Sequence, residues 1–432
     1  MRSRTIILTF VTCTAISTTI AAPRNPGPRL DDAFGRGGVV VLRAPSQTHP
    51  RRTFVPRSWA LVDGVADRSG RVYAIWEGEG AATGVLAAYD AEGRLDRAFN
   101  VDGVVTLGAL RAFFELALDS AGRILVLGFP RGADQNSPGA VVLRVLPDSR
   151  LDPAFGFGGV QRQTSQGFYP WDILSDGLGG VLVLATIGWN PRLWVVFRLG
   201  AEGMLDRTYG DVGVAVVPRV GAGGLRAHTA DATGRFVAVD WNDEEGDGLP
   251  PEYALVALDA SGRPDSTLGE RGTRVLDFGA RRAPAVTDLE VDAAGRYVVL
   301  GVGEAPRTAP FIARFLSDGT PDATWSGTED GVRDILADGA LWGTDLSSLT
   351  IDDESCYADG VRYGPHGRNW GDSVLVRVDD GTEQVWTSPT RSFRFGLDVL
   401  SVRDGTVLAL GIDRRRRRPR RVIDKLVRMR FD

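Results

Sequence analysis

The segment Asp90-Ala-Glu-Gly-Arg-Leu-Asp-Arg-Ala-Phe99, which continues into Asn100-Val-Asp-Gly103, recurs in whole or in part along the chain. Its Leu-Asp step, which becomes Pro-Asp in some copies, returns at intervals of 54 to 65 residues. An aromatic residue or a leucine follows three positions after each aspartate. A single period that fills a chain indicates a repeat architecture. The aspartates of these steps are Asp31, Asp96, Asp152, Asp206, Asp265 and Asp322.

A second element, Asp-x-x-Gly-Arg, keeps the same period. Four full copies, one looser copy at Asp176–Gly180 and two degenerate copies at Asp352–Cys356 and Arg403–Gly405 bring the number of units to seven. The full copies are Asp67–Arg71, Asp119–Arg123, Asp231–Arg235 and Asp292–Arg296. The units cover residues 30–90, 91–148, 149–202, 203–260, 261–318, 319–380 and 381–432, with approximate boundaries.

Each unit contains four short apolar runs, which in the second unit are residues 103–107, 114–118, 124–128 and 140–146. The runs are rich in Val and Leu and are bounded by Gly, Pro, Asp or Ser, which predicts four antiparallel strands. The Asp-x-x-Gly between the second and third runs is typical of a tight hairpin, because Asp accepts backbone hydrogen bonds and Gly adopts a positive φ.

Seven units of this size predict an all-β fold, a seven-bladed β-propeller formed by residues 23–432 as a single domain. The chain ends support a closed ring, since a final strand at 426–432 stops where the sequence around Pro28–Asp31 continues the repeat. The aspartate motifs are expected on one face of the ring and the long variable loops on the other. Variable loops on a rigid scaffold are the usual place for binding.

These motifs resemble those of the delta-60 repeat family of exported bacterial proteins. The resemblance is carried by Asp119-Ser-Ala-Gly-Arg-Ile-Leu-Val-Leu-Gly128 and by Leu151-Asp-Pro-Ala-Phe-Gly-Phe-Gly-Gly-Val160, with their counterparts from about Leu30 to Asp432. It is strong in units one to five and weak in units six and seven. Membership implies an exported, propeller-like protein and brings no catalytic residues with it.

The Leu-Asp-x-x-Phe-Gly element is expected to join one blade to the next. Its Asp would cap the N–H groups of a turn and its aromatic residue would fill the gap between adjacent sheets. A ring of aspartates also suits metal ligands, but a carboxylate used as a cap has little coordination left, so we expect no metal there. Arg71, Arg123, Arg235 and Arg296 recur in phase with the fold, which favours structural pairing with the aspartates over ligand binding.

The first 22 residues have the layout of a secretory signal peptide, with Arg2 and Arg4 before an uncharged run that closes on Ala21-Ala22. Its removal takes the net charge from −5 to −7. A lipid anchor at Cys13 is an alternative. Export predicts a periplasmic, outer-surface or extracellular protein without a transmembrane span, and Cys356 then has no partner for an intramolecular disulfide. We expect a monomer.

No catalytic motif stands out. His49, His228 and His366 fall in different units and have no metal-binding spacing, and the chain has no nucleophile elbow, phosphate loop or dinucleotide fingerprint. Cys356 aligns with Arg296 at a turn, which argues against a thiol enzyme. Asp359 aligns with Val299 in an expected central strand, which is an unusual place for a carboxylate.

The loop 242–248 contains oxygen ligands suited to Ca²⁺ in Asp243, Glu244 and Asp247. It lacks the spacing of a helix-loop-helix calcium site, so a solvated hairpin loop is the favoured interpretation, and no cofactor is expected.

A basic block near the C-terminus is the strongest local anomaly in this acidic chain. In a closed ring it shares a face with the segment 43–59, which gives a candidate patch for an anionic ligand. Its residues are Arg51, Arg52, Arg57, Arg414, Arg415, Arg416, Arg417, Arg418, Arg420 and Arg421. These observations favour a binding module whose partner is an anionic surface polymer or another envelope protein, with no nucleic acid. The alternative is a propeller hydrolase or lyase that acts on a polysaccharide through carboxylates in the central channel.

Overall fold

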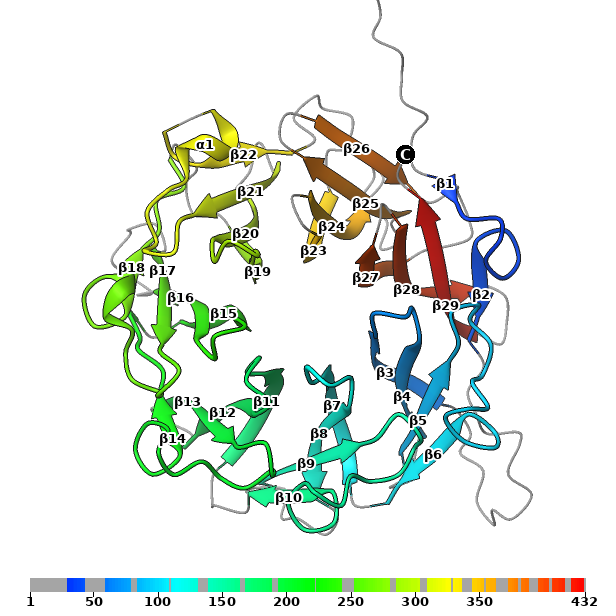
Figure 1. Ribbon diagram of the computed structural model, residues 1–432. Coiled ribbons are helices and arrows are strands. Elements are labelled where there is room, and N and C mark those ends of the chain that lie inside the picture. Colours follow the sequence, from blue (N-terminus) through cyan, green and yellow to red (C-terminus); the bar gives the residue numbers. More distant parts are fainter. Residues whose placement is uncertain are drawn as a thin grey trace, which may run out of the picture.

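A computed structural model of the chain has the form of a closed ring of β-sheets (Figure 1). It describes residues 29–42, 59–78, 84–108, 110–130, 139–163, 168–188, 193–221, 223–242, 252–279, 285–303, 309–327, 329–335, 344–352, 355–362, 372–379, 382–387, 395–403, 406–415 and 421–430.

Seven antiparallel sheets, each built around four strands, surround a central channel, which confirms the predicted seven-bladed propeller (Figure 1). In blades one to six the first strand in sequence lies nearest the channel, and the strands that follow step outward. Blade one consists of β3 (Trp59–Ala66), β4 (Val72–Gly78), β5 (Gly84–Tyr89) and β6 (Val104–Leu107). Blade two consists of β7 (Leu110–Leu118), β8 (Ile124–Pro130), β9 (Ala140–Val145) and β10 (Val160–Gln163). Blade three consists of β11 (Phe168–Ser175), β12 (Val181–Ile187), β13 (Leu193–Leu199) and β14 (Val214–Val216).

The remaining blades repeat this plan, with two short helical turns beside the outer strands. Blade four consists of β15 (Gly224–Ala230), β16 (Phe236–Asn242), β17 (Glu252–Leu258) and β18 (Thr273–Val275), with the 3₁₀ turn η2 (Ser266–Leu268). Blade five consists of β19 (Ala285–Val291), β20 (Tyr297–Val302), β21 (Pro310–Phe315) and β22 (Val332–Asp334), with α1 (Ala323–Ser326). Blade six consists of β23 (Thr344–Asp352), β24 (Ser355–Arg362), β25 (Asp372–Asp379) and β26 (Thr382–Thr387). Blade seven consists of β27 (Phe395–Arg403), β28 (Thr406–Arg415) and β29 (Arg421–Arg430), joined by β1 (Arg29–Leu30) and β2 (Val39–Val41).

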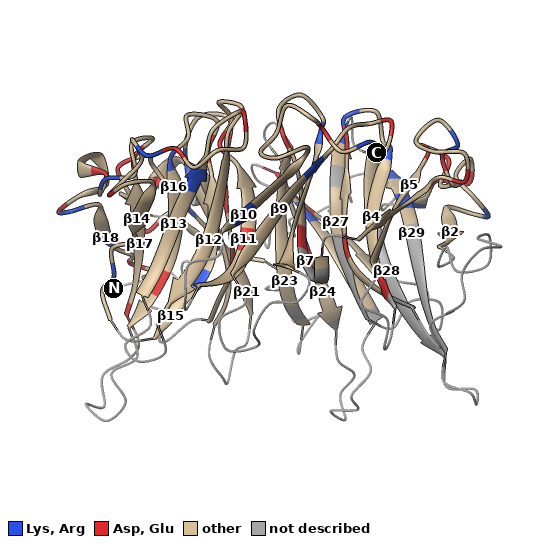
Figure 2. Ribbon diagram, turned by 90° about the horizontal axis from the view of Figure 1, so that it is seen from below, with Lys and Arg blue, Asp and Glu red and all other residues tan. Residues whose placement is uncertain are grey.

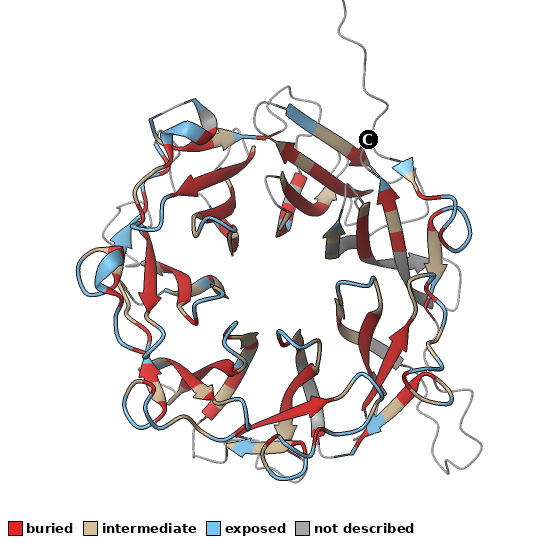
Figure 3. Ribbon diagram, in the orientation of Figure 1, coloured by how far each residue is buried: buried red, intermediate tan, exposed pale blue. Residues whose placement is uncertain are grey.

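The hydrophobic core lies between adjacent blades (Figure 3). The middle strands are apolar on both faces because each sheet is covered by a neighbour on either side, and every residue of β5, β9 and β21 is buried. The motif aromatics complete this packing as expected. Phe99 packs between blades one and two, and Phe155 packs between blades two and three.

The ring closes because the first strands of the chain pair with the last. β1 and β2 both pair antiparallel with β29, with Leu30 opposite Met429 and Val39 opposite Val427. They supply the outer edge of blade seven, which would otherwise have three strands. The predicted meeting of the two chain ends is therefore confirmed.

The predicted position of the Leu-Asp-x-x-Phe motif between blades is wrong. Residues 90–103 connect β5 to β6, the third and fourth strands of one blade, and the chain crosses to the next blade between Leu107 and Leu110. The first apolar run of each sequence unit is thus the outer strand of the preceding blade. A periodic sequence has no inherent starting point, so its period fixes the number of strands but not where one blade ends.

The two kinds of aspartate turn lie on one face of the ring, which we call the motif face. They join β7 to β8 and β9 to β10, whereas the connections from β6 to β7 and from β8 to β9 lie at the opposite ends of the strands, on the loop face. Figure 2 shows acidic and basic residues in the turns of the motif face. The predicted separation of the two kinds of connection is confirmed.

Candidate functional site

The motif aspartates cap their own turns and bind arginines. In blade two, Asp152 Oδ1 accepts a hydrogen bond from the N–H of Ala154 at 3.0 Å, and Asp152 Oδ2 lies 2.8 Å from Nε of the buried Arg144. Arg123 also reaches Asp152, with 3.4 Å between Nη1 and Oδ2. Burial acts to raise the pKa of Asp152, but the Ala154 N–H and the two guanidinium groups outweigh it, so the pKa lies below its ordinary value.

The arginine comes from the inner turn or from the third strand of the blade, depending on the blade. In blade one the turn residue Arg71 pairs with Asp96, and Ala88 stands where Arg144 stands in blade two. In blade three the turn has Gly180 in place of the arginine, and Arg198 on β13 pairs with Asp206 at 3.1 Å. At each of the six Leu-Asp or Pro-Asp motifs at least one guanidinium lies beside the aspartate, which makes the pairing structural. These pairs are Arg71–Asp96, Arg144–Asp152, Arg198–Asp206, Arg235–Asp265, Arg314–Asp322 and Arg428–Asp31.

The channel wall carries a row of acidic residues that we did not predict. The innermost strands of blades one to six each contain a β-bulge at the same level, and an acidic side chain follows it in blades one, two, three and five. These residues are Asp63, Glu115, Asp172 and Asp288. Each stands four positions before the first aspartate of the inner turn, a regular spacing that the sequence does contain.

Two of these carboxylates link their blade to the next one. Asp63 Oδ2 accepts a hydrogen bond from the N–H of Leu116 at 2.7 Å, and Asp288 Oδ2 accepts one from the N–H of Leu349 at 2.6 Å. Burial is the main reason that the pKa of Asp288 is raised to about 6. Burial and the nearby Asp288 raise the pKa of Glu290, two residues further along β19, to about 8.

Asp172 and His228 form a dyad across the interface between blades three and four. Asp172 Oδ2 lies 2.6 Å from His228 Nε2, and about a quarter of each side chain is exposed. The N–H of Ile173 donates to Asp172 Oδ1 at 2.6 Å and fixes the carboxylate. Sequence reasoning missed this dyad because its members are in different units.

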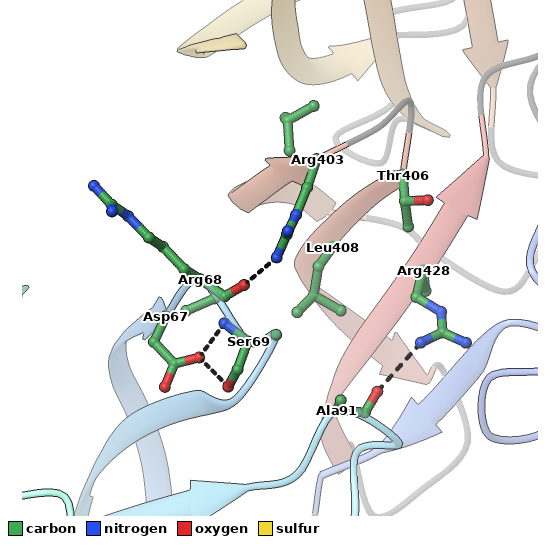
Figure 4. Close-up of a pocket in the computed structure, with 11 residues that line it drawn as sticks. Asp67, Arg68, Ser69, Ala91, Arg403, Thr406, Leu408 and Arg428 are labelled. Atoms are coloured by element: carbon green, nitrogen blue, oxygen red, sulfur yellow. Dashed lines mark hydrogen bonds between the residues drawn. The ribbon is translucent and has the colours of Figure 1, made fainter. Parts of the chain in front are cut away.

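A cavity of about 740 Å³ opens between blades seven and one, where the ring closes (Figure 4). We call it the closure pocket. The Arg403 side chain reaches across it, and its Nη1 donates to the Arg68 carbonyl oxygen at 2.8 Å. Arg428 Nη1 donates to the Ala91 carbonyl oxygen at 3.3 Å. The lining residues are Ala66, Asp67, Arg68, Ser69, Gly70, Ala91, Val402, Arg403, Thr406, Leu408 and Arg428.

A second cavity, of about 770 Å³, lies at the mouth of the channel on the motif face. It is lined by the inner turns of blades one to four, including Ser120 and Ala232. Residues 66–69 line both cavities and so form the wall between them. In Figure 4 the Arg68 side chain extends away from Arg428.

The structure places only part of the predicted anionic-ligand patch. The backbone of Arg415 pairs with that of Arg421, and the backbone of Arg414 pairs with Val422, so the basic block lies at a β-hairpin on the loop face. Arg51, Arg52, Arg57, Arg416, Arg417, Arg418 and Arg420 lie outside the described residues. Asp243, Glu244 and Asp247, the residues of the less favoured calcium-site alternative, also lie outside them.

The register corrects the alignment of two residues in blade six. Ser355, rather than Cys356, stands at the position of Arg296, and Asp359 corresponds to Leu300 rather than to Val299. The inner turn of this blade is shorter than the Asp-x-x-Gly-Arg turn, which shifted the sequence alignment by one. Cys356 is buried, and burial raises the pKa of its thiol to about 12.

Across the described part of the chain, no three or more His, Cys, Asp or Glu side chains are grouped so as to hold a metal ion. The same residues include no helix with the length and apolar character needed to span a membrane.

Comparisons with known proteins agree with the fold. Residues 295–324 match a sequence family described as a domain of unknown function (DUF5122) beta-propeller. No curated protein matches the chain. Among solved structures, the chain is similar to the polysaccharide lyase Uly1, with a TM-score of 0.52 and 12% identity over 90% of this chain and 95% of that one. It is also similar to the β-propeller domain of the Trilobed protease from Pyrococcus furiosus, with a TM-score of 0.51 and 11% identity over 85% of this chain and 95% of that one. At these identities the similarity extends to the fold alone.

Proposed function

We propose that the protein is an exported binding module that holds an anionic polymer at the cell envelope or outside the cell. The observation that carries this proposal is the basic hairpin at the end of β28 and β29, on a chain whose net charge is −5. A concentrated positive site attracts polyanions even on a protein whose net charge is negative.

Both ends of a second basic segment lie on the same face. β2 ends on the loop face beside β29, and β3 begins on that face in the neighbouring blade one. The segment 43–58, which carries Arg51, Arg52 and Arg57, therefore connects two points on the face from which the hairpin projects. The ring beneath this face provides a rigid platform. The aspartates and arginines of its repeated motifs are already paired with one another, so they do not compete for the ligand.

Retention on an immobilised polyuronate tests the proposal. The variant Arg415→Glu/Arg416→Glu/Arg417→Glu should elute at markedly lower salt than the wild type, since each lost arginine–carboxylate contact weakens binding and salt screens the contacts that remain. A matched control carries Arg36→Glu, Arg94→Glu and Arg150→Glu, which make the same charge change at exposed positions on the motif face. Equal elution of the hairpin variant and the wild type would contradict the proposal.

A second candidate function is favoured by the Asp172–His228 dyad. A carboxylate that fixes one imidazole nitrogen leaves Nδ1 of His228 as the nitrogen that can accept a proton. The dyad supplies a general base for cleavage of a polysaccharide. New chain ends released from a polysaccharide by the wild type, but not by His228→Gln or Asp172→Asn, would support this function, and no release by any of them would exclude it.

A further inference from the structure

Blades three and four place a tryptophan and an arginine at equivalent positions on the channel wall. Trp171 in blade three and Arg226 in blade four are the bulge residues of the innermost strands, because the strand register skips each of them. Both residues are exposed. Since β11 and β15 are the innermost strands of their blades and both residues lie inside the strands, the exposed surfaces face the channel.

The Trp171 indole is fixed from within the blade. Its Nε1 donates a hydrogen bond to the hydroxyl of the buried Thr186 at 3.1 Å, and its ring centroid lies 5.5 Å from that of Trp194. Even with these contacts, 46% of Trp171 is exposed. A tryptophan that is supported on its inner side and exposed to the channel offers a rigid apolar surface to a ring-shaped ligand, at little cost in side-chain entropy.

Arg226 provides hydrogen-bond donors in the neighbouring blade. Its guanidinium lies over the Trp241 ring, with 3.7 Å between Cζ and the ring centroid. The side chain makes no hydrogen bond or ion pair with another described residue. Stacking uses the flat face of a guanidinium, so the N–H groups at its edge remain available to a ligand.

The Asp172–His228 dyad brings these two residues to one side of the channel. Asp172 follows Trp171 directly, and His228 follows Arg226 by two residues. The 2.6 Å contact between Asp172 Oδ2 and His228 Nε2 therefore joins the two bulges across the interface of blades three and four. We call these four residues the channel site. It combines an apolar ring surface with groups that donate and accept hydrogen bonds.

The charges around the channel site oppose a charged ligand of either sign. Burial is the main cause of the raised pKa of both Asp63 and Asp288, and the negative charge of Asp172 raises both further. These carboxylates are therefore close enough to sense one another, and together they would repel an anion. Arg226 would repel a cation. An uncharged ligand with many hydroxyl groups avoids both penalties.

We propose that the channel site binds an uncharged saccharide, with one sugar ring against Trp171 and its hydroxyl groups bonded to Arg226 and Asp172. The C–H groups of a pyranose ring form an apolar face that packs on an indole. Its hydroxyl oxygens accept from a guanidinium, and its hydroxyl hydrogens donate to the remaining lone pairs of a carboxylate. The proposal rests on the second candidate function, because it names the substrate class of the same dyad, and it concerns a different ligand from the polyanion of the basic hairpin.

Isothermal titration calorimetry tests this site with uncharged tetrasaccharides of glucose, galactose, mannose and N-acetylglucosamine, beside a tetrasaccharide of uronic acids and choline. At least one uncharged tetrasaccharide should bind, and more tightly than the uronic acid probe or choline. Trp171→Ala should weaken this binding at least about tenfold, because it removes the stacking surface. Trp171→Phe keeps a flat ring and should recover part of the affinity. Arg226→Met removes the donors and should weaken binding about threefold or more.

Phe157→Ala is the matched control, because Phe157 is an aromatic residue with 79% exposure on a turn of the motif face. It should bind as the wild type does, and urea unfolding should show that Trp171→Ala is folded. Failure of every uncharged tetrasaccharide to bind, tighter binding of the uronic acid probe or choline, or equal binding by the wild type and Trp171→Ala would overturn the proposal.

Cleavage by the dyad is measured separately, as new chain ends released from the saccharides. Binding that depends on Trp171 without release of chain ends would exclude cleavage and leave the binding site standing. Release from an acidic polysaccharide, with no binding of an uncharged one, would overturn the ligand class proposed here and leave the cleavage function standing. The hairpin variant Arg415→Glu/Arg416→Glu/Arg417→Glu should bind uncharged saccharides as the wild type does.

Discussion

The carboxylate of Asp359, on the second strand of blade six, accepts a hydrogen bond from the backbone N–H of Val399 on the innermost strand of blade seven, with 3.2 Å between Oδ2 and N. Blades one and five make the corresponding link from their innermost strands, through Asp63 and Asp288. In blade six that position is Ser348, and Asp359 is its direct partner across the strand pair. In blade six the linking carboxylate therefore lies one strand further from the channel than in blades one and five, and it still bonds to the next blade.

Replacement of Asp359 by alanine should destabilise the protein by about 1–3 kcal/mol, because it leaves a buried N–H without its acceptor. Urea unfolding measures this loss. Asp359→Asn keeps one acceptor oxygen and should cost less. The double variant Asp359→Ala/Ser348→Asp should recover part of the loss, since it restores the arrangement of blades one and five. An Asp359→Ala protein as stable as the wild type would show that the link carries no stability.

Asp152→Ala should destabilise the protein by about 3–5 kcal/mol, because it leaves the guanidinium of Arg144 buried without its carboxylate. Only 1% of the Arg144 side chain is exposed. Asp148→Ala is the control in the same blade: it removes the exposed pair with Arg150 and should change stability by about 0–1 kcal/mol. Thermal or urea unfolding of the two variants should separate them clearly, and equal losses would refute the structural role of the motif pair.

Glu290 should make the protein less stable as the pH rises. Its pKa is raised from 4.5 to about 8 in the folded state, so the folded chain binds more protons than the unfolded chain between these values. Stability should therefore fall progressively from about pH 4.5 to about pH 8. Glu290→Gln removes this contribution and should flatten the pH dependence of unfolding, with the largest gain over the wild type near pH 8. An unchanged profile would mean that Glu290 titrates normally.

Cys356 should resist alkylation in the folded protein. Its thiol is buried and has a pKa raised to about 12, so almost no thiolate forms at pH 8. Peptide mapping after iodoacetamide treatment should find this cysteine unmodified in native protein and modified after unfolding in urea. Rapid modification of the native protein would restore the thiol-enzyme hypothesis that the burial of Cys356 argues against.

Much of the architecture was predictable because it depends on repetition. The period and the apolar runs gave the four-stranded blades, and the aspartate and arginine positions indicated paired structural residues. The strand at which each blade begins was not predictable in this way. In the sequence repeat β6 is the first strand of a unit, but in the structure it pairs with β5 and is the last strand of the preceding blade.

The channel site was harder to predict for a different reason. The dyad of Asp172 and His228 forms because two strands from separate units meet across an interface. The spacing of residues within one unit does not indicate such a contact. The row of carboxylates did leave a signal, in acidic residues such as Asp63 and Asp288 four positions before an inner-turn aspartate. No sequence pattern indicated the closure pocket, because its walls come from blades seven and one, which are far apart in the sequence.

The pairing of β2 with β29 also sets an order of events during synthesis. β2 is synthesised before the strands of blades one to six and β29 after them, so Val39 has no strand partner until Val427 has been made. Blade seven cannot acquire its outer edge, and the ring cannot close, until β29 has been synthesised. Throughout that interval the backbone groups of residues 39–41 lack their partner strand, and unpaired strand edges recruit other chains. Because β2 has only three residues, it offers few backbone groups for pairing with another chain before β29 is available.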